Sequence, residues 1–156
     1  MSAPSPEERL SELGHSVPSV VPPVAAYVPA VRSGSLVFTA GQVPMRDGEL
    51  VAAGKVGGDV SVDLGTECAQ QCALNAIAAV KAEIGDLSKV RRVVKAVVFV
   101  ASTPDFTGQP GVANGASELL AAAFGDAGVH ARSAVGVASL PLDAPVEVEL
   151  VVEVAG

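Results

Sequence analysis

Residues 130–150 read HARSAVGVASLPLDAPVEVEL and place a turn between two strand patterns. The apolar stretch that follows Arg132 is typical of a strand, and the prolines and aspartate of Leu140–Pro145 indicate a turn. From Val146 to Val154, apolar and mostly acidic side chains alternate with period two, as in a strand with one buried face. The segment therefore predicts two successive antiparallel strands, with Arg132 near the start of the first and Glu147 near the start of the second.

Arg132 and Glu147 carry groups that are suited to a site. A guanidinium is always charged and binds a carboxylate bidentately, and a carboxylate at a strand end can orient or deprotonate water. The residues alone favour ordinary roles, a structural ion pair for Arg132 and a solvated strand face for Glu147. Because the starts of antiparallel strands lie at opposite ends of a sheet, six residues separate the two side chains by roughly 20 Å. One small ligand is therefore expected to contact both only across an interface between two chains.

The composition bounds the class of protein. At 156 residues the chain is long enough for one domain with a substantial core. Apolar residues make up 49% of a chain with no Trp and one Tyr, which predicts an aliphatic core and favours an oligomer that buries the surplus apolar surface. The net charge of −7, without any basic run, argues against a nucleic-acid partner. The longest apolar run, Val93–Ala101, is interrupted by Lys95 and is too short to span a bilayer, so no membrane partner is expected.

The N-terminal residues 1–16 predict an extension with a short helix from Ser5 to Leu13, and residues 17–156 predict a single domain. The N-terminus lacks a basic region followed by an apolar stretch, so we expect no secretory signal and a cytoplasmic location. Cys68 and Cys72 lack partner Cys or His pairs in any zinc-binding pattern. They predict two core or helix-surface thiols.

The middle of the chain predicts two strands, a helix, a strand and a second helix. The expected elements are a strand pair in Val31–Gln42 with a turn at Ser33-Gly34, a long surface loop over Met45–Asp63, a helix over Thr66–Ile84, a buried strand over Val90–Ala101 and a helix over Asn114–Phe124. This order is typical of an α+β domain, a mixed β-sheet covered on one face by two helices.

These residues also resemble a known family. The pattern ARSxVxVxxLPxxxxVEVE that starts at Ala131, together with the segments AAY ending at Tyr27 and FTAGQVP ending at Pro44, resembles the Rid (YjgF-like) enamine and imine deaminases from about Val24 to Val154. The resemblance implies a fold similar to that of the Bacillus-type chorismate mutase. It also implies a homotrimer with ligand clefts between its subunits.

The resemblance implies roles for five residues. Arg132 matches the arginine that holds the substrate carboxylate, and Glu147 matches the glutamate proposed to orient the attacking water. Tyr27 matches a tyrosine that lines the pocket, Gly41 a glycine whose backbone amide faces the ligand, and Asn114 an asparagine that reaches the neighbouring cleft. Taken alone, Tyr27 is equally well explained as an aromatic at the rim of the core, Gly41 as a bulge or strand end, and Asn114 as a helix N-cap.

The implied activity is hydrolytic deamination of reactive 2-imino or 2-enamino acids to 2-keto acids and ammonia. No metal or organic cofactor is implied, because the imine carbon is already electrophilic and needs only positioning and a proton shuttle. Ala40 and Ala134 depart from the family pattern, since many members have serine and cysteine at these places. The departures keep open an alternative, a non-catalytic trimer that binds small carboxylates as a sensor or with a protein partner. Endoribonuclease activity, also attached to the family, fits the acidic composition poorly, and His130 receives no role.

Overall fold

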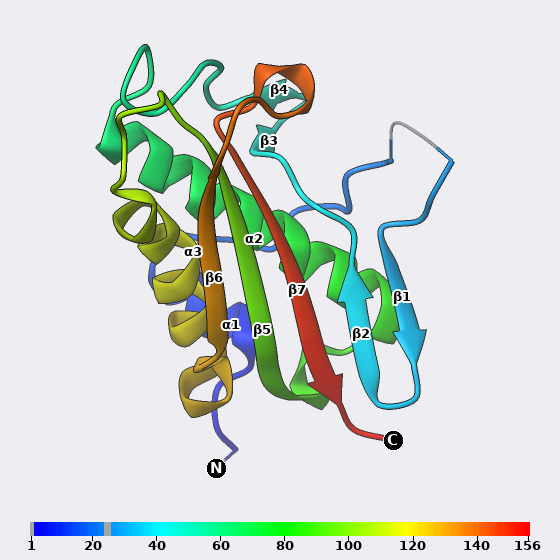
Figure 1. Ribbon diagram of the computed structural model, residues 1–156. Coiled ribbons are helices and arrows are strands. Elements are labelled where there is room, and N and C mark those ends of the chain that lie inside the picture. The colour runs from blue at the N-terminus through cyan, green and yellow to red at the C-terminus, as the bar shows by residue number, and fades with distance from the viewer. Residues whose placement is uncertain (1, 24–25) are drawn as a thin grey trace.

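The fold is built on a five-stranded mixed β-sheet. The computed structural model describes residues 2–23 and 26–156, so Val24 and Ala25 of the N-terminal resemblance lie outside the described residues. The strands are β1 (Ala30–Ser33), β2 (Leu36–Thr39), β5 (Val90–Ala101), β6 (Ala131–Val137) and β7 (Val146–Val154). Their order across the sheet is β1-β2-β7-β5-β6 (Figure 1), and only β5 and β6 run parallel. This confirms the predicted α+β class with a mixed sheet.

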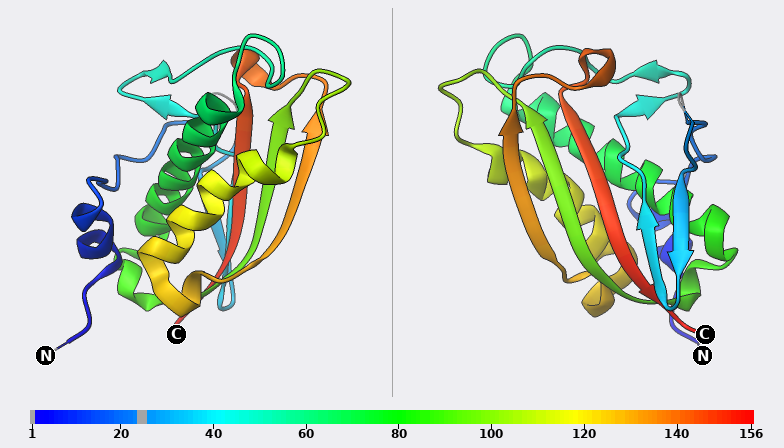
Figure 2. Two further views of the ribbon diagram at one scale, coloured as in Figure 1. Left: turned by 90° about the vertical axis from the view of Figure 1, so that its left-hand side faces the viewer. Right: turned by 45° about the vertical axis from the view of Figure 1, so that its right-hand side comes forward.

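Two long helices, α2 (Val62–Ile84) and α3 (Gln109–Phe124), cover one face of the sheet (Figure 2). The Ser61 side chain caps α2 by accepting a backbone N–H in its first turn, so this helix begins earlier than predicted. Gly85, at φ 82°, ends α2 in the left-handed region that favours glycine. A Cβ on Gly115 would collide with the α2 backbone, which means that the two helices cross in direct contact.

The start of α3 corrects one prediction. The helix was predicted to begin at Asn114, yet α3 begins at Gln109 and includes Pro110, because proline is tolerated in the first turn of a helix, where its missing N–H has no intrahelical partner. The N-cap of α3 is Gly108, without a side-chain cap bond, so the explanation of Asn114 as an N-cap is wrong. Asn114 lies inside the helix, and its side chain faces β6.

The N-terminal extension is fastened to the domain. The short helix α1 (Pro6–Glu12) lies where it was predicted and starts with a complete capping box at Ser5. Leu10 is fully buried in the common core, and Glu7 pairs with Lys81 of α2 at 3.3 Å. The extension therefore contributes to the core rather than covering it loosely.

The segment Met45–Asp63, predicted as a long surface loop, is more ordered than expected. It contains a small hairpin of β3 (Met45–Arg46) and β4 (Glu49–Leu50), which pair antiparallel. Val56 is fully buried, and its backbone N–H donates to the carbonyl at the end of β5 at 2.8 Å. The glycines give this segment the composition of a loop, but the buried side chains of Val56 and Val60 pack it against the domain.

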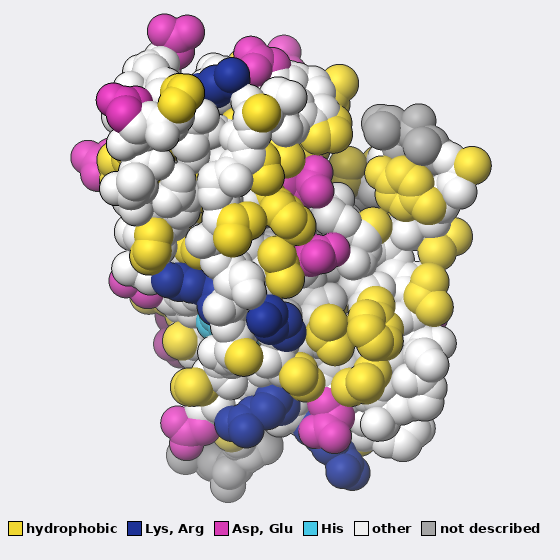
Figure 3. Space-filling model, in the orientation of Figure 1, with side chains coloured by type: hydrophobic (Ala, Val, Ile, Leu, Met, Phe, Trp, Pro, Cys, Tyr) yellow, Lys and Arg dark blue, Asp and Glu magenta, His cyan; other side chains and the backbone are white. Residues whose placement is uncertain are grey.

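The core is aliphatic, as predicted, and lies between the sheet and the helices. In β7 the even-numbered residues are buried and the odd-numbered ones are partly exposed. The opposite face of the sheet, which we call the open face, carries no helix of the described chain and is seen in Figure 3. Its exposed apolar side chains include Val31, Phe38, Val94 and Val135.

Two further predictions concern the cysteines of α2 and the absence of a membrane-spanning segment. Cys68 and Cys72 are buried and form no disulfide. Burial raises the pKa of the Cys68 thiol to about 11 and that of Cys72 well above its usual value. Both are thus unreactive core thiols, as predicted. In the part of the chain that the structure describes, every helix is too short or too polar to cross a membrane.

Candidate functional site

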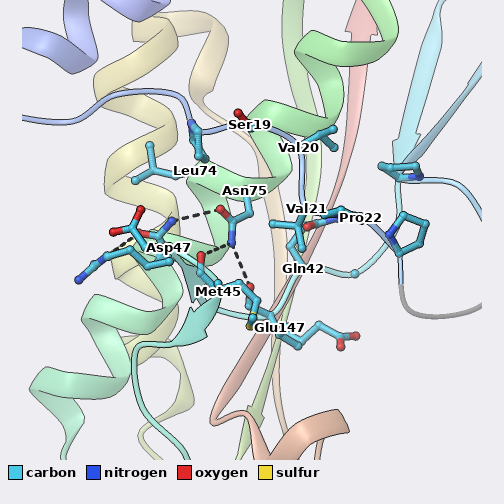
Figure 4. A pocket seen from close by; sticks show the side chains of 18 of the residues that line it. Ser19, Val20, Val21, Pro22, Gln42, Met45, Asp47, Leu74, Asn75 and Glu147 are labelled. Atoms are coloured by element: carbon cyan, nitrogen blue, oxygen red, sulfur yellow. Dashed lines mark hydrogen bonds between the residues drawn. The ribbon is translucent and has the colours of Figure 1, made fainter.

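A pocket of about 1010 Å³ opens beside the start of β7 (Figure 4). Its walls come from residues 14–23 of the N-terminal segment, from α2 and from the hairpin region around Met45. Tyr27, Gly41 and Glu147 all line it. Three of the five site residues that the sequence suggested therefore meet in one pocket.

Glu147 and Gly41 are packed against each other in this pocket. Gly41 follows β2, and the next residue, Gln42, exchanges two backbone hydrogen bonds with Val148 of β7 at 2.8 and 3.0 Å. An added Cβ on Gly41 would collide with the Glu147 carboxyl group, whose Cδ would lie only 2.7 Å away. Only glycine permits this approach, so the glycine brings the backbone against the carboxylate.

The protonation of Glu147 is perturbed by its surroundings. The carboxyl group is about half buried, and burial raises its pKa above the usual range for glutamate. The charge on Glu149, the next residue on the same face of β7, raises the pKa further. A carboxylate that holds its proton more tightly than usual is a stronger base when ionised, as general-base catalysis requires.

A polar network behind the pocket fixes the chain that follows Gly41. Asn75 of α2 is fully buried, and its Nδ2 donates to the carbonyls of Val43 at 3.1 Å and Met45 at 3.0 Å. Gln71 donates to Asn75 at 3.1 Å and accepts from the Nε of Arg46 at 3.0 Å. Sequence analysis missed this network. Its signal is a pair of amides four residues apart on the buried side of a helix.

Arg132 is anchored on the other side of the molecule, against α3. Its Nη1 donates to Asn114 Oδ1 at 2.8 Å and to Ser117 Oγ at 3.1 Å, and its Nη2 donates to the Pro110 carbonyl at 3.4 Å. Both Nη1 hydrogens are thereby used. Within the described residues, Nε makes no hydrogen bond and Nη2 makes only the long one to Pro110. Nε and Nη2 together form the edge of a guanidinium that binds a carboxylate side-on.

The sheet separates Arg132 from Glu147 in a way that corrects the predicted geometry. The two strands are not neighbours, because β5 lies between β6 and β7. Arg132 is level with Ala96 of β5 and Glu147 with Phe99, so three residues and two strand spacings separate their Cα atoms by about 14 Å instead of 20 Å.

The faces of the sheet keep the two side chains apart. Partners directly across a ladder project to the same face. Arg132 shares the face of the buried Ala96, toward the helices, whereas Glu147 shares the open face with Phe99. Within one chain the two groups therefore point to opposite sides of the sheet.

The five suggested residues thus form two groups in one chain. Tyr27, Gly41 and Glu147 line the pocket, and Arg132 with Asn114 forms a second, anion-facing patch next to α3. Across the described parts of the chain, His, Cys, Asp and Glu side chains nowhere gather in the groups of three that would hold a metal ion. The reactive groups that the structure places at the two sites are the Glu147 carboxylate and the Arg132 guanidinium.

Comparisons with known proteins identify the family of the chain and proteins of similar fold. The family model described as Endoribonuclease L-PSP matches residues 18–154. The chain is 45% identical over 145 residues to Protein TCP17 of Trypanosoma cruzi, covering 92% of this chain and 91% of that protein. It is 33% identical over 139 residues to the 2-iminobutanoate/2-iminopropanoate deaminase of Dermatophagoides farinae, covering 88% and 92%. The crystal structure of protein Atu1372 from Agrobacterium tumefaciens superposes with a TM-score of 0.91 at 48% identity, covering 96% and 92%.

Proposed function

Because the chain belongs to the Endoribonuclease L-PSP family, also called the YjgF or Rid family, we propose that it hydrolyses reactive 2-imino and 2-enamino acids to 2-keto acids and ammonia. The observation that carries the proposal is the Glu147 carboxylate, half buried in the pocket, packed on Gly41 and with a raised pKa. The deaminase of Dermatophagoides farinae, at 33% identity, supports the same reaction class.

The proposed substrate bears a carboxylate, and Arg132 is the group prepared for it. Its Nη1 is held by α3, and its free edge is of the kind that grips a planar carboxylate bidentately. Arg132 does not line the pocket, and its side chain projects to the face of the sheet opposite to that of Glu147. We therefore propose that each site combines Arg132 of one copy with the Glu147 pocket of another.

The open face of the sheet supports assembly into a homotrimer. It exposes apolar side chains such as Phe38 at 44% and Val31 at 53%, more apolar surface than a lone sheet face ordinarily leaves to water. Carboxylates project from β7 and cations such as Lys95 from β5 on this same face (Figure 3). A ring of three copies would bury the apolar patch, with unlike charges available to face one another.

The assembly gives a direct prediction. Light scattering on a size-exclusion column is expected to report three times the chain mass of 15.5 kDa, because the ring is closed. A species of one chain mass at micromolar concentration would contradict both the ring and the shared site.

The proposed reaction needs no group beyond these side chains and water. Arg132 holds the carboxylate while the ionised Glu147 accepts a proton from a water molecule, whose oxygen bonds to the imine carbon. The imine nitrogen takes up protons as the C–N bond breaks, and ammonia leaves. One imine and one water thus yield one 2-keto acid and one ammonia.

The test couples the protein to an amino-acid oxidase that releases 2-imino acids. Semicarbazide traps the imine, so hydrolysis is measured as a loss of semicarbazone formation. We expect the purified protein to suppress trapping in proportion to its concentration. If trapping is unchanged while pyruvate still binds in a calorimeter, the protein is a carboxylate binder without turnover. Release of RNA fragments in place of imine hydrolysis would identify a ribonuclease.

Arg132→Ala is expected to lower kcat/KM for imine hydrolysis by roughly ten- to a hundred-fold, the effect of losing a charge-assisted bidentate contact. Arg132→Lys should restore little, because an ammonium lacks the planar fork. The matched control is Arg91→Ala at an exposed arginine of β5. Circular dichroism and the trimer mass should match those of the unmodified protein, and unchanged kcat/KM would remove Arg132 from the site.

A further inference from the structure

We infer that His130 and Ser117 are positioning residues, which hold the Arg132 guanidinium in its carboxylate-binding orientation. The inference deepens the proposed function, since it concerns the same arginine. Three hydrogen bonds link the residues into a chain from the guanidinium to the backbone at Gly128. Neither residue touches the Glu147 pocket.

The directions of these hydrogen bonds follow from donor and acceptor chemistry. His130 Nδ1 lies 2.6 Å from the Gly128 carbonyl, which can only accept, so Nδ1 carries a proton. In the neutral ring, Nε2 is then an acceptor, 2.9 Å from Ser117 Oγ. The Ser117 hydroxyl donates to Nε2, and its oxygen accepts from Arg132 Nη1 at 3.1 Å.

This series of hydrogen bonds fixes the rotation of the Ser117 hydroxyl. A serine inside a helix can instead donate to the carbonyl four residues back, which would turn its lone pairs. Nε2 of His130 competes for that proton and keeps a lone pair of Ser117 facing Arg132. With Asn114 Oδ1 on the other Nη1 hydrogen at 2.8 Å, the guanidinium plane is fixed and its Nε edge stays available.

The arrangement belongs to the neutral form of His130. A protonated ring would present an Nε2 hydrogen to Ser117 Oγ, so two positively charged donors would converge on one oxygen. The elements around His130 carry several charged side chains: Arg132 on β6; Arg91, Arg92 and Lys95 on β5; Glu118 on α3; Asp126 on the turn Gly125–Gly128; and Glu7, Glu8, Arg9 and Glu12 on α1. No ion pair joins His130 to any of them in the described ranges, and Arg132 alone shares a hydrogen-bond partner with it.

The first test does not depend on turnover. In ¹⁵N-labelled protein above neutral pH, the His130 ring is expected in its Nδ1–H tautomer, the minor form of a free histidine, with a non-protonated Nε2. Ser117→Ala should move the Nε2 resonance, because its donor is lost. Ser11→Ala, at an exposed serine of α1, is the control and should leave the resonance unchanged. An Nε2–H tautomer for His130 would overturn the inference even in a fully active enzyme.

The second test separates positioning from general stability. His130→Leu and Ser117→Ala are each expected to raise KM about three- to ten-fold, with kcat within about two-fold, as the loss of one ordinary hydrogen bond in the chain that positions Arg132 predicts. His130→Gln, whose amide oxygen can take the place of Nε2, should restore most of the affinity. Equal loss in the Gln and Leu variants, or a fall in kcat alone, would overturn the inference.

The protonated form of the ring gives the sign of the effect. Under conditions where the ring signals of His130 in the NMR spectrum show a doubly protonated imidazole, KM of the unmodified protein should exceed that of His130→Gln, which keeps a neutral acceptor. A relative fall in KM would mean that histidine acts only as an added positive charge. If the unmodified protein hydrolyses no imine, the proposed function fails, and a pyruvate titration followed by NMR replaces KM in the same comparison.

Discussion

Glu147→Gln is expected to lower kcat for imine hydrolysis by roughly 10²- to 10⁴-fold, the contribution of a positioned general base. The amide keeps the size of the side chain, so the packing against Gly41 and the pocket wall are preserved. It cannot accept the proton of the attacking water. The semicarbazone assay at saturating substrate measures the effect.

The matched control is Glu149→Gln, at the next outward-facing carboxylate of the same strand. It should retain turnover, and its pH profile adds information. Because the charge on Glu149 raises the pKa of Glu147, removing that charge should move the acid limb of the profile to lower pH. Full kcat in Glu147→Gln would exclude Glu147 as the base.

Glu147→Gln, which is expected to lower kcat, is expected to raise the stability of the folded protein. Burial raises the pKa of Glu147 in the folded state, so the folded protein binds this proton more tightly than the unfolded chain. Stability is then greatest when Glu147 is protonated and decreases as pH rises from the ordinary glutamate pKa through the raised one. Above that window Glu147→Gln should melt at a higher temperature than the unmodified protein, while below it the difference should vanish.

Mixing Arg132→Ala chains with Glu147→Gln chains is expected to raise the activity above that of either variant alone. The two side chains project to opposite faces of one sheet, so a site that uses both must take them from different copies. In a random 1:1 mixture, about one site in four has an intact arginine and an intact glutamate, and within trimers that contain both variants it is about one site in three. The recovery is therefore limited to about a quarter of the full rate in the mixture and about a third in the isolated mixed trimers.

The mixing experiment requires verified exchange. Co-refolding or co-expression with two affinity tags allows isolation of trimers that contain both variants, and native mass spectrometry checks their composition. As a control, each variant is taken through the same procedure alone and should keep its own low activity. Mixed trimers without activity would show that Arg132 and Glu147 do not cooperate across an interface.

The periodicity of the sequence located most elements of the fold but not their arrangement. The alternation in Val146–Val154 and the short helix that follows Ser5, with proline and acidic residues in its first turn, depend on local physics, and both predictions are confirmed. The predicted secondary structure was wrong where a residue type is compatible with both a loop and an ordered element. Pro110 is compatible with a loop and with the first turn of α3, and the glycines of residues 45–63 concealed the buried Val56.

The sheet order required a rule beyond periodicity. β5, α3 and β6 form a strand–helix–strand unit, and such a crossover places its two strands parallel and usually adjacent. Applying that rule to the sequence would have moved β7 to the other side of β5. It would also have corrected the supposed pairing of the strands that carry Arg132 and Glu147.

Other parts of the site arise from contacts between distant segments. Residues 14–23 form a wall of the pocket, and Asn75 supports it from α2. No local pattern brings these segments together. His130 and Ser117 lie 13 residues apart and were invisible as a pair until β6 was placed along α3.

The contact between Gly41 and Glu147 has a consequence for how sequences of this kind can diverge. A methyl group at position 41 would meet the flexible end of the glutamate rather than rigid backbone, so the chain could still fold with the carboxylate swung aside. A change of Gly41 to alanine would thus leave folding intact and impair only catalysis by Glu147. The two positions should therefore change together, and a lineage that has lost the acid at 147 is released from the requirement for glycine at 41.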